Sequence, residues 1–159
     1  MTLTIALFEP RIPQNTGNIA RTCAAFNIPL ILIKPLGFSL DDRYLKRAGL
    51  DYWKYVNVST FENFDEFKNG LSFNSRIIGC SSYGGEKITD INFQSNDVLL
   101  FGREDNGLPD HIRSQSSFIA TIPMPNKANS KGMDGVRSLN LSVSVAIVTF
   151  VAGNKINLW

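Results

Sequence analysis

The sequence predicts an α/β domain with a mostly parallel, six-stranded sheet flanked by helices. Short apolar runs alternate along the chain with amphipathic segments. This alternation is typical of βαβ units, in which a crossover helix returns the chain to a parallel neighbour. No internal repeat, low-complexity segment or change of composition divides the 159 residues, so we expect residues 1–159 to form one domain.

The six expected strands differ in how clearly the residues predict them. Most are short apolar runs of the kind found in sheets that are buried on both faces. The run 52–58 is weaker, because Trp53 and Tyr55 alternate there with polar residues. In chain order the expected strands are residues 3–8, 30–33, 52–58, 76–80, 98–101 and 118–122.

Helices are expected where apolar residues recur every three or four positions. Ile19, Cys23 and Phe26 share one face of the first helix, and Asn15 and Asn18 precede it as candidate caps. Two aspartates begin the second helix, phenylalanines spaced three apart build the third, and a proline at the first helical position opens the fourth. The expected helices are residues 19–26, 41–47, 61–69, 109–113 and 139–152.

The apolar tail of the chain fits two periods. Its serines and Asn140 alternate with leucines and valines, which is strand spacing, yet Leu139, Val143 and Phe150 also share one helical face. Because a strand of that length would be unusual, we predict a helix. Ser138 is a candidate N-cap for this helix.

Composition sets the outer limits on function. The net charge of +2 and the pI near 8.6 permit an anionic partner such as RNA without requiring one. Two distant cysteines and one histidine fall short of the roughly four ligands of a structural zinc site, so no metal is expected. They also form no disulfide framework, which favours a reducing compartment. Without a signal peptide or an apolar run of about 18 residues, the protein is expected in the cytoplasm.

Several common catalytic motifs are missing from the sequence. It contains neither GxGxxG nor GxxxxGK, which excludes the dinucleotide fingerprint and the P-loop. HExxH and GxSxG are missing too. A serine nucleophile usually needs a histidine, and His111 lies in a short helix with the character of a surface segment, so hydrolysis by a Ser–His pair is not expected.

Polar residues of catalytic type gather in three loops that follow predicted strands. In a parallel sheet the carboxyl ends of the strands form the edge that binds ligands. Each residue also has an ordinary structural interpretation, because asparagines cap helices, an arginine can be a solvated helix residue and a glutamate can belong to a turn. The set comprises Asn15, Asn18 and Arg21 after the first strand, Glu104 after the fifth, and Arg137, Ser138 and Asn140 after the sixth.

Three stretches together resemble the three motifs of SPOUT-class RNA 2′-O-methyltransferases. They are residues 13–21 (PQNTGNIAR), residues 101–109 (FGREDNGLP), and Ile122-Pro123-Met124 with residues 137–142 (RSLNLS). Residues 37–53 are similar to the minimal subfamily that methylates the wobble ribose of tRNA. The resemblance covers nearly the whole chain.

This resemblance implies a fold, a reaction and a set of site residues. The fold would carry a C-terminal deep trefoil knot, and the protein would work as a homodimer with helices near both chain ends in the interface. The reaction would transfer a methyl group from S-adenosylmethionine to the ribose 2′-hydroxyl of the wobble cytidine or uridine of tRNA. The implied catalytic residues are Arg21, Asn15, Glu104, Ser138 and Asn140. The implied cofactor-binding residues are Cys80, Gly102, Ile122, Ser138 and Leu139.

The chemistry suggests a specific part for Arg21. A ribose 2′-hydroxyl must lose its proton as it attacks the methyl group, so proton acceptance and alignment of the reactants are the main tasks. A guanidinium stays protonated and is a poor base. We therefore expect Arg21 to grip the neighbouring phosphate in a bidentate manner, while that phosphate or water takes the proton.

Two departures from the wobble subfamily leave the methylated position open. Arg103 stands where a proline is common, and the loop 125–136 is longer than in minimal enzymes. The alternatives are 2′-O-methylation of another tRNA or rRNA ribose, and a knotted RNA-binding protein without activity. An inactive relative should have lost the polar motif residues, which are present here. Candidate phosphate contacts are Lys46, Arg47, Lys127 and Lys131.

Overall fold

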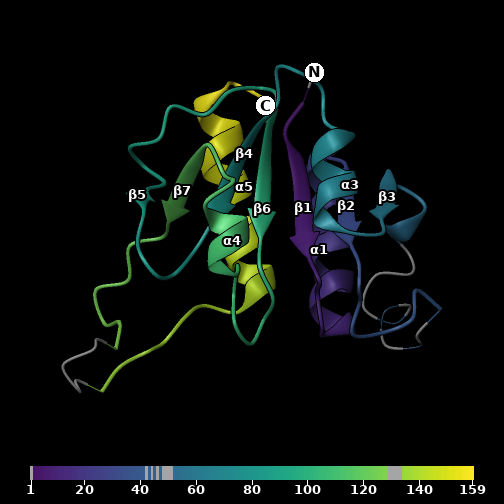
Figure 1. Ribbon diagram of the computed structural model, residues 1–159, viewed down its shortest axis with the longest axis horizontal. Coiled ribbons are helices and arrows are strands. Elements are labelled where there is room, and N and C mark those ends of the chain that lie inside the picture. Colours follow the sequence, from purple (N-terminus) through teal and green to yellow (C-terminus); the bar gives the residue numbers. More distant parts are fainter. Residues whose placement is uncertain (1, 42, 44, 46, 48–51, 129–133) are drawn as a thin grey trace.

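The computed structural model describes residues 2–41, 43, 45, 47, 52–128 and 134–159 and confirms the expected α/β architecture (Figure 1). Strands and helices alternate along the chain, and the helices flank the sheet. In order the elements are β1 (Thr4–Phe8), α1 (Pro13–Phe26), β2 (Leu30–Ile33), β3 (Val58–Phe61), α3 (Phe64–Asn69), β4 (Arg76–Cys80), β5 (Glu86–Lys87), β6 (Asp97–Phe101), α4 (Asp110–Arg113), β7 (Phe118–Thr121) and α5 (Leu141–Lys155).

The described strands form one parallel sheet in the order β3-β2-β1-β6-β4-β7-β5. It has seven strands, whereas six were predicted. The additional strand is β5, which pairs with β7 through Glu86 and Lys87. Both residues are charged and exposed, so they carry no strand pattern that the sequence could reveal.

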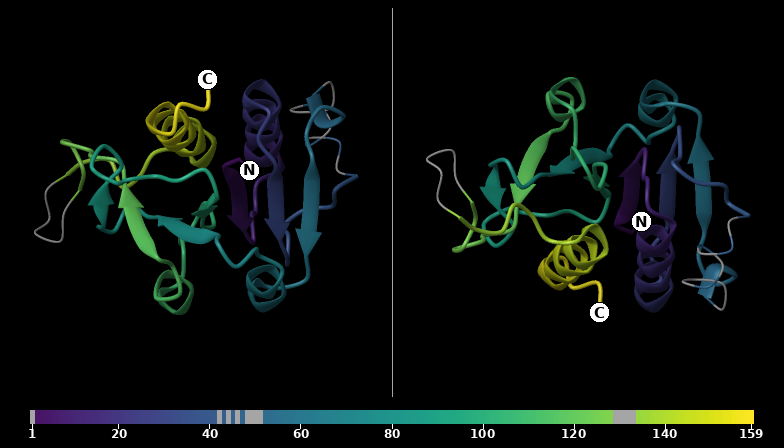
Figure 2. Two further views of the ribbon diagram at one scale, coloured as in Figure 1. Left: turned by 90° about the horizontal axis from the view of Figure 1, so that it is seen from above. Right: turned by 90° about the horizontal axis from the view of Figure 1, so that it is seen from below.

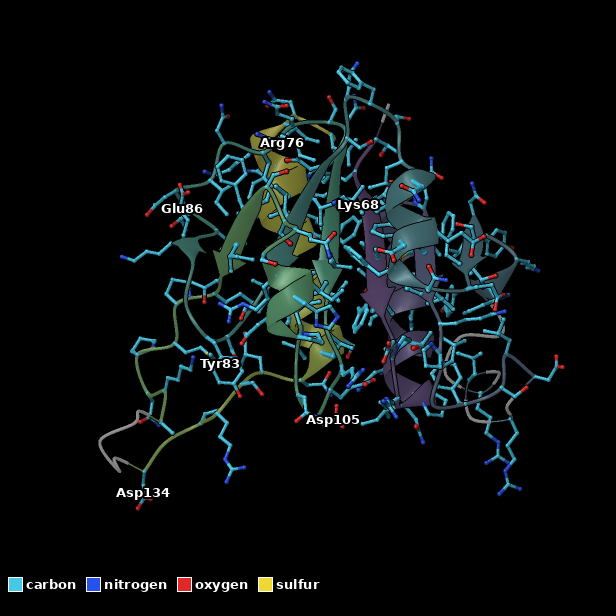
Figure 3. All side chains as sticks on the ribbon, in the orientation of Figure 1. Lys68, Arg76, Tyr83, Glu86, Asp105 and Asp134 are labelled. Atoms are coloured by element: carbon cyan, nitrogen blue, oxygen red, sulfur yellow. The ribbon has the colours of Figure 1, made fainter. Side chains whose placement is uncertain are left out.

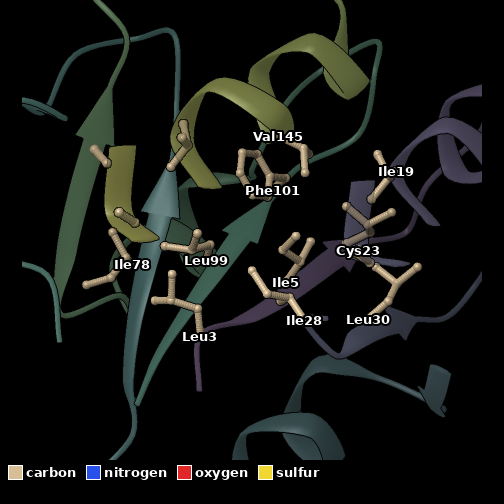
Figure 4. Close-up of a cluster of buried hydrophobic side chains, with 14 of the residues drawn as sticks. Leu3, Ile5, Ile19, Cys23, Ile28, Leu30, Ile78, Leu99, Phe101 and Val145 are labelled. Carbon is tan, nitrogen blue, oxygen red and sulfur yellow. The ribbon is translucent and has the colours of Figure 1, made fainter. Parts of the chain in front are cut away.

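Two apolar layers hold the helices on the sheet. On one face α1 and α5 lie side by side and pack through Ile19 and Val145 onto strand residues such as Ile5, as Figure 4 shows. On the other face α3 and α4 pack through Phe67 and Ile112. Figure 2 shows the two helix pairs on opposite sides of the sheet. Alternate residues of β1, β2, β4 and β6 therefore belong to alternate layers, which explains their unbroken apolar runs.

Helix α1 begins at Pro13, well before the predicted start at Ile19. Proline suits this position because the first turn of a helix has no internal acceptor for its N–H groups. Asn15 and Asn18 therefore lie inside the helix, and the interpretation of them as caps is wrong. The helix ends at Asn27, which is left-handed with φ 53°.

The strand predicted at 52–58 is wrong. Tyr52 and Trp53 are helical, and the carbonyl of Tyr52 accepts a hydrogen bond from the amide of Tyr55 at 2.8 Å. Alternation of aromatic and polar residues therefore arose from a turn, and the strand β3 starts only at Val58. Phe61 is the last residue of β3, although the prediction placed it at the start of the next helix.

Helix starts elsewhere also differ from prediction. Helix α3 is capped by Asn63, whose side chain accepts a hydrogen bond from Glu66 N at 2.8 Å. Pro109 is the N-cap of α4 and not its first residue. The tail is helical as predicted, but Asn140 caps α5, so the assignment of Ser138 as the cap is wrong.

Some predictions fall wholly or partly on residues outside the described part of the chain. In the predicted helix 41–47, Arg43, Leu45 and Arg47 are helical, and Leu45 is buried. Lys46 and Lys131 lie outside the described residues. The segment of the predicted knot includes residues 129–133, so the knot stays a prediction. Among the helices described, none has the length and hydropathy to cross a bilayer.

Candidate functional site

A pocket of about 360 Å³ opens at the carboxyl ends of β4, β6 and β7. Backbone and side chains that follow these strands form most of it, and the first turns of α5 close one wall through Leu141, Ser144 and Val148. The volume lies in the range of small-molecule sites. All five residues expected to hold the cofactor line this pocket, namely Cys80, Gly102, Ile122, Ser138 and Leu139.

The loop after β6 is a tight hairpin that requires glycine. Arg103 and Gly107 exchange backbone hydrogen bonds of 3.2 and 2.9 Å. A Cβ atom added to Gly102 would lie 2.1 Å from the carbonyl carbon of Gly107, so no other residue fits there. The hairpin turns back through Gly107, which has a φ of 65°. This geometry places Glu104 at a fixed point beside the pocket.

Glu104 is bound to the start of α1. Its Oε2 accepts a hydrogen bond from Arg11 N at 2.8 Å, and its Oε1 accepts one from Ile12 N at 3.0 Å. Its Oε1 also accepts a longer one, 3.4 Å, from Asn15 Nδ2. A carboxylate at a helix N-terminus satisfies free N–H groups and complements the helix dipole. Glu104 thus joins the loop after β6 to α1.

Asn15 and Asn140 continue this connection to the last helix. Asn140 donates from Nδ2 to Asn15 Oδ1 at 3.0 Å. Its own Oδ1 accepts from the amides of Ser142 and Val143 at 2.8 and 3.4 Å and so caps α5. Glu104, Asn15 and Asn140 therefore form one chain of hydrogen bonds across three loops that are distant in sequence.

Arg21 lies apart from this chain. It is exposed on α1, and its guanidinium lies 4.7 Å from the ring centroid of Tyr52. Arg21 does not line the pocket, and it makes no ion pair with the residues that the structure describes. The structure thus brings together Glu104, Asn15 and Asn140, and it places Ser138 in the pocket wall, while Arg21 stands free for an external anion.

The thiols and the imidazole contribute no nucleophile to the site. Burial raises the pKa of Cys23 to about 12 and raises the pKa of the Cys80 thiol as well, so both stay protonated at neutral pH. His111 is exposed on α4 and does not line the pocket. Among the residues described, no group of three His, Cys, Asp or Glu side chains could hold a metal ion.

Tyr83 and Arg103 are among the pocket residues that were not predicted as site residues. Tyr83 lines the pocket from the turn after β4, a strand end to which the rule of carboxyl ends also applies. Arg103 was noted in the sequence only as a departure from a family pattern. Its guanidinium donates to the carboxylate of Glu9 and lies 5.6 Å from the ring centroid of Phe8. No sequence signal links Glu9 to Arg103, because the pairing depends on β1 and β6 being neighbours.

Comparison with known proteins decides the class of this site. The model of the SpoU rRNA Methylase family matches residues 2–150. The chain belongs to the SpoU methylase family. A relative from Methylovorus glucosotrophus is named tRNA (cytidine(34)-2′-O)-methyltransferase. It is 43% identical over a region that covers 93% of this chain and 92% of the relative's own length.

Solved structures of SpoU methylase relatives share the fold. One, described as giving structural insights into the 2-OH methylation of C/U34 on tRNA, has a TM-score of 0.89 and 40% identity, over 97% of this chain and 95% of that chain. An AdoMet-bound rRNA methyltransferase from Sinorhizobium meliloti has a TM-score of 0.80 and 24% identity, over 96% of this chain and 56% of that chain. The second likeness concerns the fold alone.

Proposed function

We propose that the protein transfers a methyl group from S-adenosylmethionine to the ribose 2′-hydroxyl of the wobble nucleotide, cytidine or uridine, of tRNA. The observation that carries the proposal is the pocket at the carboxyl edge, in which all five residues of the expected cofactor set meet. Relatives at 40–43% identity that cover almost the full chain are described by methylation of nucleotide 34. We place the enzyme in the cytoplasm, where it acts as a single domain.

The pocket fits S-adenosylmethionine in size and in chemistry. Apolar side chains such as Ile122, Leu139 and Val148 suit the adenine ring, and the hydroxyl groups of Ser81 and Ser138 suit the polar parts of the molecule. When bound, the sulfonium supplies an electrophilic methyl group. The residues of the chain then have to hold the ribose in line with it and to favour loss of the hydroxyl proton.

Glu104, Asn15 and Asn140 position this site. Both carboxylate oxygens of Glu104 already accept hydrogen bonds from the backbone N–H groups of Arg11 and Ile12. The role of Glu104 is to fix the loop after β6 against α1. Asn140 fixes the segment that carries Ser138 and Leu139 to the same helix. Together they set the spacing of the pocket walls.

Arg21 binds the substrate. It is exposed and held over the ring of Tyr52 at 4.7 Å, an arrangement that leaves its N–H groups free for a phosphate. The phosphate beside the wobble ribose, or a water molecule, then accepts the hydroxyl proton. Bidentate contact with that phosphate aligns the ribose.

The active form is a homodimer. Val143, Phe150 and Trp159, on α5 and the tail beyond it, are 47%, 54% and 49% exposed, although each is a large apolar side chain. Trp159 stacks on Phe150 and on Phe26 of α1, which extends this apolar surface toward α1. A second copy of the chain would cover it. Light scattering of the purified protein tests this part: a mass of one chain at micromolar concentration would exclude it.

Two experiments test the reaction. Calorimetry with S-adenosylmethionine should show one binding site per chain, and no binding would favour a non-catalytic RNA-binding protein. Mass mapping of ribose methyl groups in tRNA from a deletion strain should show loss of the methyl group at the wobble nucleotide. If another tRNA or rRNA ribose loses its methyl group instead, the position is wrong while the chemistry stands.

A further inference from the structure

An exposed tyrosine stands at the mouth of the pocket. Tyr83 follows β4 in the turn 81–85 and is 69% exposed, yet it lines the same pocket as Ser138. Figure 3 shows Tyr83 and Asp105 at the same edge of the sheet, opposite the edge that carries Arg76. The ring is thus accessible beside the position where the proposed reaction takes place.

Hydrogen bonds and two glycines fix the conformation of the turn that carries Tyr83. Its amide donates to Ser81 Oγ at 3.0 Å, and its carbonyl accepts from Arg113 Nη2 at 3.5 Å. Gly84 and Gly85 follow with φ values of 101° and 128°, which other residues rarely adopt. A Cβ atom on Gly85 would lie 2.5 Å from a backbone oxygen of β7. A ligand that stacks on the ring would therefore need to order little of the chain.

The base of the long loop 125–136 holds a cation against this ring. Lys127 Nζ lies 5.3 Å from the ring centroid of Tyr83. The two arms of the loop are joined by hydrogen bonds of 3.0 Å from Ala128 N to Val136 O and 2.9 Å from Val136 N to Asn126 O. The described base of this loop thus fixes Lys127 at the pocket mouth.

The charges around Tyr83 suit a polyanion. Arg137 is exposed, lines the pocket, and makes no ion pair or hydrogen bond with the described residues. The two carboxylates in the pocket lining are Glu104, which is engaged with α1, and Asp105, which accepts from Asn106 N at 2.9 Å. An exposed aromatic ring flanked by cations is the arrangement by which proteins bind single-stranded nucleic acid.

We propose that Tyr83 is a stacking platform for an unpaired base next to the methylated ribose, with Lys127 and Arg137 as its phosphate contacts. The identity of the RNA rests on the proposed function. A base can stack on the ring only where it is free of its own helix, so the platform selects the unpaired anticodon loop over paired stems. It also gives the long loop a role in substrate recognition, because the base of that loop supplies Lys127.

Binding of RNA tests the platform without depending on methyl transfer. The probe is a fluorescein-labelled anticodon stem–loop RNA, measured by anisotropy in the presence of S-adenosylhomocysteine. Tyr83→Ala should raise the Kd for this RNA by about tenfold, because base–aromatic stacking contributes about 1–3 kcal/mol per base. Tyr83→Phe keeps the ring and should stay within about twofold of the wild type.

The chain provides a matched control in Tyr55. This residue precedes β3, which lies at the opposite end of the strand order from β7 and β5. Tyr55 is 63% exposed, and its ring centroid lies 4.9 Å from Lys54 Nζ, but Tyr55 does not line the pocket. Tyr55→Ala should leave RNA binding unchanged. An equal loss in the two alanine variants would overturn the platform, as would an equal loss with a fully paired RNA duplex. A Tyr83→Ala variant that binds the cofactor more weakly but RNA normally would assign the ring to the cofactor instead.

Lys127 provides an independent readout of the same surface. Each phosphate contact to a single strand contributes about 0.7 to the slope of log K against log salt. Lys127→Ala should lower that slope by about this amount with the stem–loop RNA. An unchanged slope would remove Lys127 from the platform. If the wild type binds the stem–loop but methylates nothing, the proposed function fails while the platform stands.

Discussion

The two edges of the parallel sheet carry charged groups in opposite arrangements. At the amino edge, Arg76 donates from Nε and Nη2 to the two carboxylate oxygens of Asp97, each at 2.7 Å, and Gln94 N donates to the same carboxylate at 2.8 Å. Asp97 is fully buried. At the carboxyl edge, Arg137 lines an open pocket, is exposed and makes no ion pair with the described residues. Arg21 lies outside that pocket on α1 and is likewise exposed and without an ion pair in the described part of the chain.

This difference separates groups that stabilise the fold from groups that are available to a ligand. The bidentate contact with Asp97 raises the pKa of Arg76 and leaves its charge fully committed. Removal of one member of a buried pair of this kind strongly lowers the free energy of unfolding, because the remaining charge lacks its partner. At the other edge Glu104 is engaged by the N–H groups of Arg11 and Ile12, and Arg103 is paired with Glu9, whereas Arg137 makes no ion pair with the described residues. Substitutions at four places in the structure, with their controls, test this division.

The largest expected effect is on stability, at the amino edge. Asp97→Ala should lower the free energy of unfolding by about 3 kcal/mol, because the Arg76 guanidinium loses its carboxylate partner and keeps the carbonyl of Asn92 as an acceptor. Chemical denaturation measures this value, and the Kd for S-adenosylmethionine should not change. Asp110→Ala is the control, since it removes an exposed ion pair of 3.7 Å with Arg113 and should change stability little. Equal effects of the two changes would contradict the distinction.

The next effect is on turnover, at the carboxyl edge. Arg21→Lys should lower kcat by about 100-fold, because a lysine ammonium cannot hold a phosphate in the bidentate geometry of a guanidinium. Unfolding and cofactor affinity should match the wild type, since Arg21 is exposed and outside the pocket. Single-turnover kinetics and calorimetry measure the two quantities. Near-normal turnover would mean that Arg21 is not the phosphate clamp.

Substitution of Glu104, which joins the pocket to α1, should affect both stability and turnover. Glu104→Gln should lower the free energy of unfolding by about 1–2 kcal/mol and should also lower kcat, because the neutral amide binds the N–H groups of Arg11 and Ile12 less strongly. Thermal unfolding and kcat should be measured on the same preparation. Loss of kcat with unchanged stability would make Glu104 a direct participant in proton transfer and not a positioning residue.

The smallest expected effect concerns the cap of α5. Asn140→Ala should lower the free energy of unfolding by about 1 kcal/mol, as removal of an N-cap does. Asn140→Ser should restore the cap but not the hydrogen bond to Asn15, so it separates stability from pocket geometry. Ser138→Ala should leave stability unchanged while it weakens cofactor binding. If Ser138→Ala lowered the free energy of unfolding, Ser138 and not Asn140 would be the N-cap of α5.

Sequence patterns predicted most of the sheet because its strands are apolar on both faces. Short runs such as Leu30–Ile33 have no other stable place than a buried strand. The pattern failed for residues 52–58, where aromatic alternation belongs to a turn, and for the exposed β5. Both are decided by contacts along the edges of the sheet, which local periodicity does not record.

The residues that line the pocket were easier to predict from the sequence than the hydrogen bonds that join them. The rule of strand ends and the family motifs together placed Cys80, Gly102 and Ile122, which the structure brings into one pocket. The hydrogen bond from Asn140 to Asn15 spans 125 positions of the chain, so no local pattern indicates it. Tyr83 was missed because nothing in the sequence links an exposed tyrosine in a glycine turn to Lys127, which the structure places beside its ring.

The central claim is that the carboxyl-edge pocket serves methylation of the wobble ribose. The most direct test is reconstitution of the purified protein with unmodified tRNA and S-adenosylmethionine, followed by mapping of the product by mass spectrometry. The account predicts one new methyl group, on the 2′-oxygen of the wobble nucleotide. A methyl group on a base or on another ribose, or no methyl group although both ligands bind, would contradict it.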